Sequence, residues 1–227
     1  VKHSKNMPWY EGGTLRYILE NIHVGSDLNH IDPRFPVQYV VRPISDKFHD
    51  YRGYAGRIAG GVFRKGDRVM ILPSGFVTTI ESIDFYKESL DEAYPPMSVT
   101  FRLKDDFDIS RGDMIVKENN VPRIEQDIDV MMCWMNEKPL QPRLKYHLKQ
   151  TTNDVKCMVK EIKYKVDVNT LDRIEDGNDL KMNEIARVSL RTTKPLFFDS
   201  YRQNRQTGSL ILIDEGTNNT MGVGMIV

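Results

Sequence analysis

Histidines are the side chains best suited to metal binding or to acid–base catalysis near neutral pH. Only His23 and His30 stand near each other in this chain, and their separation is too loose for the ligand spacing of a zinc site. No serine or cysteine stands in a pattern typical of a nucleophile with its base, and most carboxylates fall on predicted turns. The sequence therefore predicts neither a metal site nor a catalytic residue. The histidines are His3, His23, His30, His49 and His147.

A glycine-rich stretch over residues 50–69 raises the question of phosphate binding. It contains an Asp-x-x-Gly pattern at Asp50 and Gly53, of the kind that GTPases place near Mg²⁺. A phosphate loop, however, ends in Gly-Lys-Ser/Thr, and no Gly-Lys pair occurs in the chain. An Asn-Lys-x-Asp motif for base recognition is missing as well. We therefore predict no nucleotide site within this chain.

Arginines follow the glycine-rich stretch at Arg52, Arg57, Arg64 and Arg68. Because side chains alternate between the two faces of a strand, some of these arginines would share a face. One interpretation is the solvated exterior of a β-barrel. The other is a docking surface for an acidic partner or a phosphate. A second polar cluster, over residues 201–205, allows the same two interpretations.

The composition describes an ordinary globular protein. Its 227 residues suffice for two domains, and 40% of them are hydrophobic and 28% charged. The net charge of +0 argues against a nucleic-acid footprint spread over the whole surface, although a local basic patch would fit it. Two cysteines, Cys133 and Cys157, are too few for a disulfide scaffold and favour a reduced, cytoplasmic protein with two buried thiols. No apolar run reaches the ~20 residues of a membrane helix.

A short helix is predicted near the beginning of the chain, within a first segment over residues 1–34. Two glycines precede Thr14, which is a suitable N-cap. Leu15, Ile18, Leu19 and Ile22 then recur at helical spacing and form one apolar face. Because a helix this short is marginal in isolation, we expect that face to pack on the following barrel or on a preceding domain.

A first β domain is predicted over residues 35–118. Glycines alternate with β-type residues in the glycine-rich stretch, which indicates bulges, bends or close approach of backbones at the corner of a small barrel. Turns are expected at residues 65–67, 73–76 and 109–113, and residues 87–96 are expected to form a polar loop.

A second β domain is predicted over residues 119–227. Its six strands would make a second small barrel, so the predicted fold class is all-β: two tandem small β-barrels preceded by a short α-helical linker. The charged residues 172–183 would form a long loop or a short helical turn. The strands are expected over residues 128–135, 146–150, 155–168, 185–190, 210–213 and 221–227.

Several segments resemble the second and third domains of translational GTPases. Residues 52–61 are similar to the G-x-V-x-x-G-R-x-x-x-G strand of that family's second domain, with a bulkier residue at Tyr54. Residues 65–69 are similar to its K-x-G-D-x-V turn. Residues 208–214 and 220–227 resemble the closing strands of the third domain.

A second resemblance covers essentially the whole chain. It is to the large, GTP-binding subunits of bacterial sulfate adenylyltransferases (ATP sulfurylases). The matching segments are NMPWYEG (6–12), FPVQYV (35–40), FHDYRGYAG (48–56), LPSG (72–75), DISRGD (108–113), YRQN (201–204) and TG (207–208). The combination is specific to that family, and it implies that the two barrels are of the translation-factor domain II and domain III type.

The resemblance also implies an activity that extends beyond this chain. In that family a GTPase domain, which uses GTP and Mg²⁺, precedes the two barrels, and a small catalytic subunit uses ATP to make adenylyl sulfate from sulfate. This chain would then be a C-terminal fragment without the GTPase domain, with no cofactor of its own and inactive alone. Its expected partners are the small subunit and its own GTPase domain, with Arg52, Arg57, Tyr201, Arg202 and Asn204 as candidate contact residues.

Two alternatives follow from the same pattern. An elongation-factor-like double barrel could bind RNA, with one barrel face holding the aminoacylated end of a tRNA. Binding that weakens steeply with salt would distinguish this function. A double-barrel protein with purely structural duties is the third interpretation.

Overall fold

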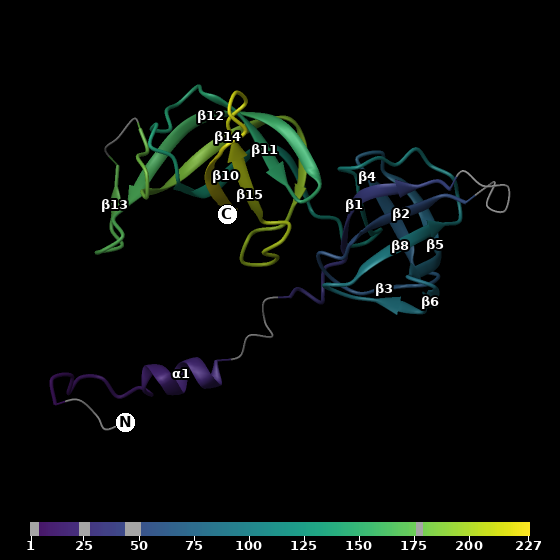
Figure 1. Ribbon diagram of the computed structural model, residues 1–227, viewed down its shortest axis with the longest axis horizontal. Coiled ribbons are helices and arrows are strands. Elements are labelled where there is room, and N and C mark those ends of the chain that lie inside the picture. Colours follow the sequence, from purple (N-terminus) through teal and green to yellow (C-terminus); the bar gives the residue numbers. More distant parts are fainter. Residues whose placement is uncertain (1–4, 23–27, 44–50, 176–178) are drawn as a thin grey trace.

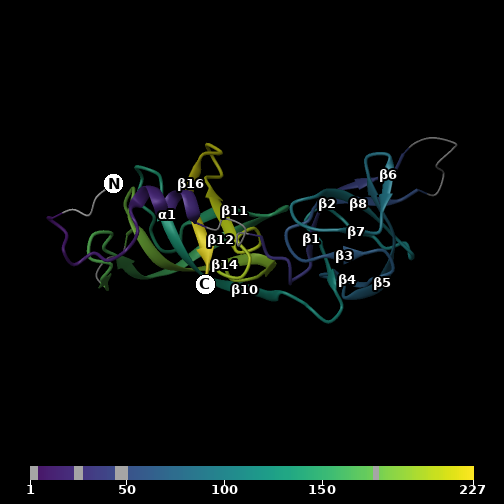
Figure 2. The same ribbon diagram turned by 90° about the horizontal axis from the view of Figure 1, so that it is seen from below.

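The computed structural model describes residues 5–22, 28–43, 51–175 and 179–227. Within these residues the chain forms one short helix and two separate β-barrels that lie side by side (Figure 1). Both views show the two barrels joined through a narrow waist (Figure 2). The prediction of two tandem small β-barrels preceded by a short helix is confirmed.

The first barrel is closed by six strands in the order β4-β9-β1-β2-β8-β5, with β5 paired back to β4. β6 extends this sheet beyond β5, and β3 pairs separately with β7. The strands are β1 (Arg34–Val41), β2 (Gly53–Arg57), β3 (Phe63–Arg64), β4 (Arg68–Leu72), β5 (Phe76–Phe85), β6 (Glu88–Leu90), β7 (Glu92–Ala93), β8 (Ser98–Leu103) and β9 (Met114–Lys117).

The second barrel is closed in the order β11-β15-β16-β10-β14-β12, with β12 paired back to β11. All of these pairings are antiparallel. The strands are β10 (Arg123–Trp134), β11 (Lys145–Gln150), β12 (Asn153–Val166), β13 (Arg173–Ile174), β14 (Ile185–Phe198), β15 (Ser209–Ile213) and β16 (Thr220–Ile226).

The glycine-rich stretch forms a corner of the first barrel, as its composition predicts. A Cβ on Gly56 of β2 would lie only 2.5 Å from the carbonyl oxygen of Pro36 on β1, so the two backbones approach closely there. The register of β1 against β2 shifts between Val37 and Tyr39, beside this contact. Gly66 adopts a φ of 87° in the predicted turn before β4, a conformation that favours glycine.

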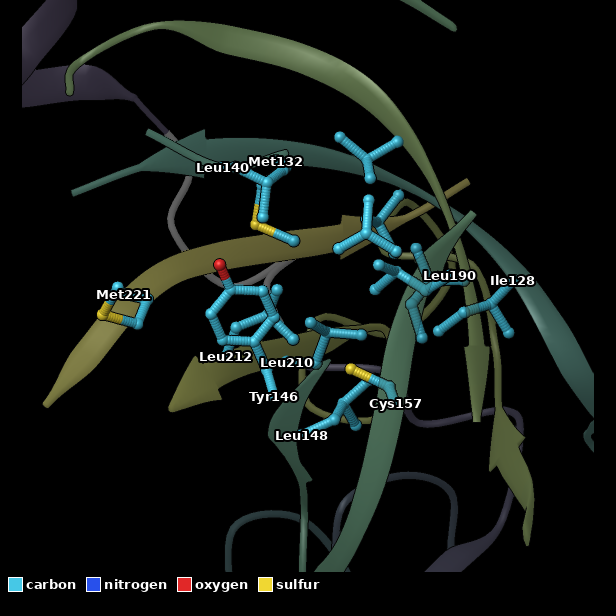
Figure 3. Packing of buried hydrophobic residues seen from close by; sticks show 14 of the residues in the cluster. Ile128, Met132, Leu140, Tyr146, Leu148, Cys157, Leu190, Leu210, Leu212 and Met221 are labelled. Carbon is cyan, nitrogen blue, oxygen red and sulfur yellow. The ribbon is translucent and has the colours of Figure 1, made fainter. Parts of the chain in front are cut away.

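Each barrel has its own apolar core. In the first barrel the rings of Phe35 and Phe101 stack with centroids 4.2 Å apart, and Phe63 lies 5.2 Å from Phe101. The second barrel packs aliphatic and sulfur-containing side chains around Tyr146 (Figure 3). Cys157 belongs to this core, and burial raises the pKa of its thiol to about 12, so it stays protonated and unreactive at neutral pH.

The helix α1 (Leu15–Asn21) begins as predicted, because the Thr14 hydroxyl accepts a hydrogen bond of 3.1 Å from the Tyr17 amide. None of its residues is buried. Leu15 is 72% exposed and Leu19 is 66% exposed. In Figure 1 the helix lies apart from both barrels. The apolar face therefore packs on neither barrel. No helix among the described residues is long and apolar enough to cross a membrane.

Three local predictions need correction. The polar loop predicted over residues 87–96 contains the short strands β6 and β7, which pair with β5 and β3. The charged excursion over residues 172–183 contains β13 and a bridge from Leu180 to Leu140, and its residues 176–178 lie outside the described ranges. Cys133 is only partly buried, because it points to the face of β10 opposite Met132 and Trp134.

Candidate functional site at the junction of the two barrels

The two barrels meet through a set of buried polar and apolar contacts that we call the junction. Its centre is Arg34, the first residue of β1, whose side chain is 2% exposed. Arg34 Nε donates to Asp199 Oδ2, and Arg34 Nη2 donates to Asp199 Oδ1, each over 2.9 Å. Asp199 follows β14 of the second barrel and is 4% exposed. This bidentate, buried ion pair joins one barrel to the other.

Further hydrogen bonds satisfy the two charged groups. Arg34 Nη1 donates to the backbone oxygen of Asn120 over 2.8 Å and to its side-chain oxygen over 2.9 Å. Asn120 lies in the segment that connects the barrels. The hydroxyl of Thr207, which is fully buried, donates to Asp199 Oδ2 over 2.8 Å. A buried ion pair needs such partners, since its desolvation cost otherwise exceeds the attraction.

A second polar cluster surrounds Asp32, just before β1. Its carboxylate accepts hydrogen bonds from Asn29 (2.8 Å), Asn120 (2.9 Å) and Gln203 (3.0 Å). Burial alone would raise the pKa of Asp32. The three hydrogen bonds and the charge of Arg34 outweigh burial, so the pKa is lowered from its usual value. The Asp32 carboxylate thus binds three parts of the chain: Asn29 before β1, Asn120 in the connecting segment and Gln203 in the second barrel.

The residues 199–208 form the loop through which the second barrel reaches the first. Asn204 is 3% exposed, and its Nδ2 donates to the carbonyl oxygen of Ala59 in the first barrel over 3.0 Å. Its Oδ1 accepts from the amides of Gln206 and Thr207. Gln150, also buried, donates to the Thr207 carbonyl over 2.7 Å. The loop is therefore held both from within its own barrel and from across the junction.

An apolar cluster completes the junction. Phe197 of β14 packs with Leu72 of β4 and with Met114 and Val116 of β9, and all four side chains are at most 4% exposed. This cluster is separate from the two barrel cores and draws residues from both barrels. It removes apolar surface from water on both partners, which favours the docked arrangement.

Backbone approach at the junction leaves no room for larger residues. A Cβ on Gly60 would lie 2.5 Å from the carbonyl oxygen of Asp32 and 2.7 Å from Asn204 Nδ2. A Cβ on Gly208 would lie 2.5 Å from the backbone of Tyr201. Gly60 therefore permits the loop of residues 199–208 to pack closely on the first barrel. Gly208 permits the two ends of that loop to approach each other.

The predicted contact residues fall into two groups. Arg57, Tyr201, Arg202 and Asn204 lie at or beside the junction, because Arg57 ends β2 next to Ala59 and the other three belong to the loop. Arg57 and Arg202 are exposed, Tyr201 is half-buried, and Asn204 is engaged within the chain.

Arg52 directly precedes β2, at the end opposite Arg57. Its guanidinium contacts Asp108 over 3.3 Å and lies 6.0 Å from the centre of the Tyr54 ring. The arginines of the glycine-rich stretch lie on or directly before three strands that do not pair with one another, namely β2, β3 and β4. Arg64 pairs with Glu92, and Arg68 pairs with Glu118. The contact role of Arg52 stays a prediction.

The residues at the centre of the junction were not found by sequence reasoning. Arg34 follows Pro33 and precedes an apolar strand, and Asp199 follows the apolar run 196–198. The only sequence signal for these two residues is that each is a charged residue directly next to an apolar run. This signal does not identify the opposite charge with which each residue pairs. The described residues contain no group of histidine, cysteine or carboxylate side chains that could hold a metal ion.

The fold agrees with known translation-factor structures. Over 97% of this chain, the structure superposes on 53% of sup35 complexed with GDP, with a TM-score of 0.77 and 18% identity. It also superposes on translation elongation factor SelB from Methanococcus maripaludis, with a TM-score of 0.71 and 18% identity over 93% of this chain and 44% of SelB. Residues 127–227 match the family model of GTP-eEF1A C-terminal domain-like proteins.

Sequence similarity extends over the whole chain. The chain is 48% identical to sulfate adenylyltransferase subunit 1 of Bacteroides fragilis, and it spans 47% of that protein. It is also 48% identical to the bifunctional enzyme CysN/CysC of Mycobacterium tuberculosis, of which it spans 37%. The chain thus spans about half or less of the length of these relatives. With its translation-factor-like domains, it is homologous over its full length to the C-terminal part of sulfate adenylyltransferase subunit 1.

Proposed function

We propose that this chain is the coupling part of a sulfate adenylyltransferase. In the whole enzyme, a GTPase domain hydrolyses GTP with Mg²⁺, and a small catalytic subunit uses ATP and sulfate to make adenylyl sulfate and diphosphate. The two barrels connect the GTPase domain to the small subunit and transmit the nucleotide state as a rigid-body shift. The proposed setting is the cytoplasm, and the chain alone is inactive.

The observation that carries this proposal is the buried Arg34–Asp199 ion pair at the junction. An element that transmits a displacement must not bend in its middle. The ion pair, the Asp32 cluster through its bond from Gln203, and the Phe197 cluster together connect the two barrels at three places. We infer that the two barrels move as one body. The homology to subunit 1 supports a second subunit as the recipient of that movement.

A calorimetric titration of this chain with the purified small subunit of sulfate adenylyltransferase, without nucleotide, tests the partner. We expect micromolar affinity or better. If the chain does not bind, the same titration with a full-length subunit 1 separates two cases. Binding by the full-length subunit alone would move the interface to the GTPase domain, and binding by neither would refute the proposal. Micromolar GTP binding by this chain alone would also contradict it.

Charge-reversal variants test the contact residues. Arg202→Glu changes an exposed residue beside the junction, and Arg52→Glu changes a residue at the far end of β2. We expect at least one of them to weaken small-subunit binding by about a hundredfold or more, because a like charge placed against a complementary surface costs several kcal/mol at an interface. If both variants bind as the unmodified chain does, these two residues are not contact residues.

The coupling itself is tested in the complex of full-length subunit 1 with the small subunit. Weakening the junction through the equivalent of Arg34→Lys is expected to raise the number of GTP molecules hydrolysed per adenylyl sulfate formed. Lysine keeps the charge but lacks the bidentate fork. The matched control is the equivalent of Arg102→Lys, at an exposed pair with Glu81 within the first barrel. An unchanged ratio in a folded Arg34→Lys complex would refute a coupling role for the junction.

A further inference from the structure

An open cleft of about 500 Å³ lies beside the junction, between the two barrels. The first barrel contributes Arg57 from the end of β2 and Arg111 from the turn before β9. The second barrel contributes Lys149 from β11, and residues of the turn after β11 and of the loop 199–208 also line the cleft. Three cationic side chains from two different barrels therefore face one space.

The positive charge of this cleft is not balanced. No carboxylate is among the described residues that line it. Arg57, Arg111 and Lys149 form no ion pair with any carboxylate in the part of the chain that the structure describes, whereas Arg64 and Arg68 each pair with a glutamate. Like charges that face one another across a concave surface concentrate the positive potential there and attract anions.

Two of the three cations are held in place by backbone acceptors. Arg57 Nε donates to the carbonyl oxygen of Pro96 over 3.3 Å, and Arg111 Nη1 donates to that of Gln38 over 3.1 Å. Among the described residues these are the bonds of the two guanidinium groups, so their remaining N–H groups can contact a ligand. Because the guanidinium groups are already oriented, less side-chain entropy is lost on binding.

The two walls of the cleft approach each other closely beside Arg111. Gly112, with a φ of 98°, follows Arg111, and a Cβ there would lie 3.1 Å from Asn153 Oδ1 of the second barrel. Thr152, which lines the cleft next to Asn153, has a buried hydroxyl with no hydrogen-bond partner in the described structure. Because this hydroxyl is shielded from solvent, it is not itself a contact for a ligand in the cleft.

The lining indicates the class of anion. No aromatic side chain is among the described lining residues, so the cleft offers no stacking surface for a nucleobase. It is open and mainly polar, unlike the enclosed apolar pockets that hold small molecules. Carboxylates on an extended segment suit it better, because they can contact cations on both walls in succession.

We propose that the cleft beside the junction binds an acidic segment of a partner protein, whose aspartate or glutamate side chains pair with Arg57, Arg111 and Lys149. This site needs both barrels in their docked arrangement. The proposal does not depend on which protein supplies the acidic segment. A negative result in the small-subunit titration would therefore leave it unchanged.

The test uses this chain and a short fluorescein-labelled polyglutamate peptide, with fluorescence anisotropy at low salt. The variant is Arg57→Gln, Arg111→Gln and Lys149→Gln together. We expect the dissociation constant to rise about tenfold, from the loss of three partly exposed charge pairs. The matched control removes three other exposed cations, as Lys87→Gln, Lys104→Gln and Lys138→Gln, and is expected to change affinity less than about twofold. Thermal unfolding verifies that both variants are folded.

Each other result would overturn the proposal. Equal weakening by the control triple would mean that the peptide responds to net charge rather than to the cleft. Displacement of the peptide by inorganic phosphate at submillimolar concentration would mean a site for small anions. Tighter binding of a short oligouridylate than of the peptide, lost in the Arg57, Arg111 and Lys149 variant, would mean a nucleic-acid site. No peptide binding at low salt would mean that the cleft is unoccupied by acidic segments.

Discussion

Arg34 and Asp199 are 165 residues apart in the sequence, yet their side chains make two hydrogen bonds of 2.9 Å each across the junction. Both side chains are at most 4% exposed. The pair therefore joins the two barrels, each of which has its own apolar core, through a buried contact.

Removing one partner of the ion pair should destabilise the chain strongly. Arg34→Met leaves the Asp199 carboxylate buried without its counter-charge, which costs about 3–5 kcal/mol in comparable buried pairs. Urea unfolding followed by tryptophan fluorescence measures this loss, since Trp134 is fully buried in the second barrel. Removing both charges, as Arg34→Met with Asp199→Leu, should cost less than the Asp199 or Arg34 change alone.

The control for this prediction is Arg64→Met. Arg64 pairs with Glu92 on the surface, with side chains 59% and 52% exposed. Such exposed pairs contribute about 0–1 kcal/mol. If Arg34→Met cost no more than Arg64→Met, the junction would not be the stabilising contact that its burial indicates.

Much of the fold could be predicted from local patterns. Thr14 is an N-cap because its hydroxyl meets the Tyr17 amide, and this requires only the residues of one turn. The turn at Gly66 and the barrel corner at Gly56 likewise follow from what glycine alone can do in a strand pattern. These features depend on short-range sterics, which the sequence displays directly.

The junction could not be predicted in the same way. Arg34 and Asp199 are found together only when both barrels are folded and docked, and one sequence does not reveal which distant charges meet. Asn204 illustrates the same limit. Its position in a polar cluster indicated a surface residue, whereas its side chain is buried and bonded to Ala59. The resemblance to the large subunits of sulfate adenylyltransferases identified residues 201–204 as a matching segment. It did not identify the role of each side chain within that segment.

Acid should weaken the junction through Asp32. Its folded-state pKa lies below the usual value of 3.8. A group with a lowered pKa contributes stability that is present above the usual value and is lost as the pH falls through the folded-state pKa. The difference in unfolding free energy between the unmodified chain and Asp32→Asn should therefore be constant near neutral pH and should shrink below about pH 4.

Urea unfolding at a series of pH values measures this difference. Asp106→Asn is the control, because Asp106 is exposed. Its difference from the unmodified chain should stay small at every pH. A difference for Asp32→Asn that grows as the pH falls would have the wrong sign and would show that the Asn29, Asn120 and Gln203 bonds do not favour the ionised carboxylate.

Enlarging Gly60 should loosen the junction, because a Cβ there would also lie 2.7 Å from Asn204 Nδ2 of the second barrel. The new Cβ of Gly60→Ala would meet the Asp32 backbone at 2.5 Å, and a backbone atom cannot move aside as a flexible side chain can. Overpacking of this kind costs about 1–3 kcal/mol. Hydrogen exchange should show faster exchange at the Thr207 amide, which is bonded to Asn204, while amides of the β11–β12 pair keep their protection.

Gly216→Ala is the matched control for Gly60→Ala. A Cβ there lies 3.4 Å from the flexible carboxylate of Asp214, which is an ordinary contact. We expect unchanged stability within about 0.5 kcal/mol. Equal exchange at the Thr207 amide in both variants would mean that the approach of Gly60 to Asp32 does not hold the loop in place.

Shortening the apolar face of α1 should leave the stability of the barrels unchanged. Leu15→Ala and Leu19→Ala together remove side chains that are 72% and 66% exposed, and alanine preserves helix propensity. We expect the midpoint of urea unfolding to shift by no more than the equivalent of about 0.5 kcal/mol.

Leu148→Ala shows how much stability is lost when a buried leucine of a barrel is truncated, and it is the reference for the α1 variant. Leu148 of β11 is fully buried in the second barrel, and truncation of such a leucine costs about 2–5 kcal/mol. If the α1 variant approached that cost, the helix would pack on the barrels in solution, and its apolar face would stabilise the double barrel. If it did not, the face is free to bury itself against another protein surface. The same variant can then be titrated with the small subunit. Loss of affinity without loss of stability would place α1 at that interface.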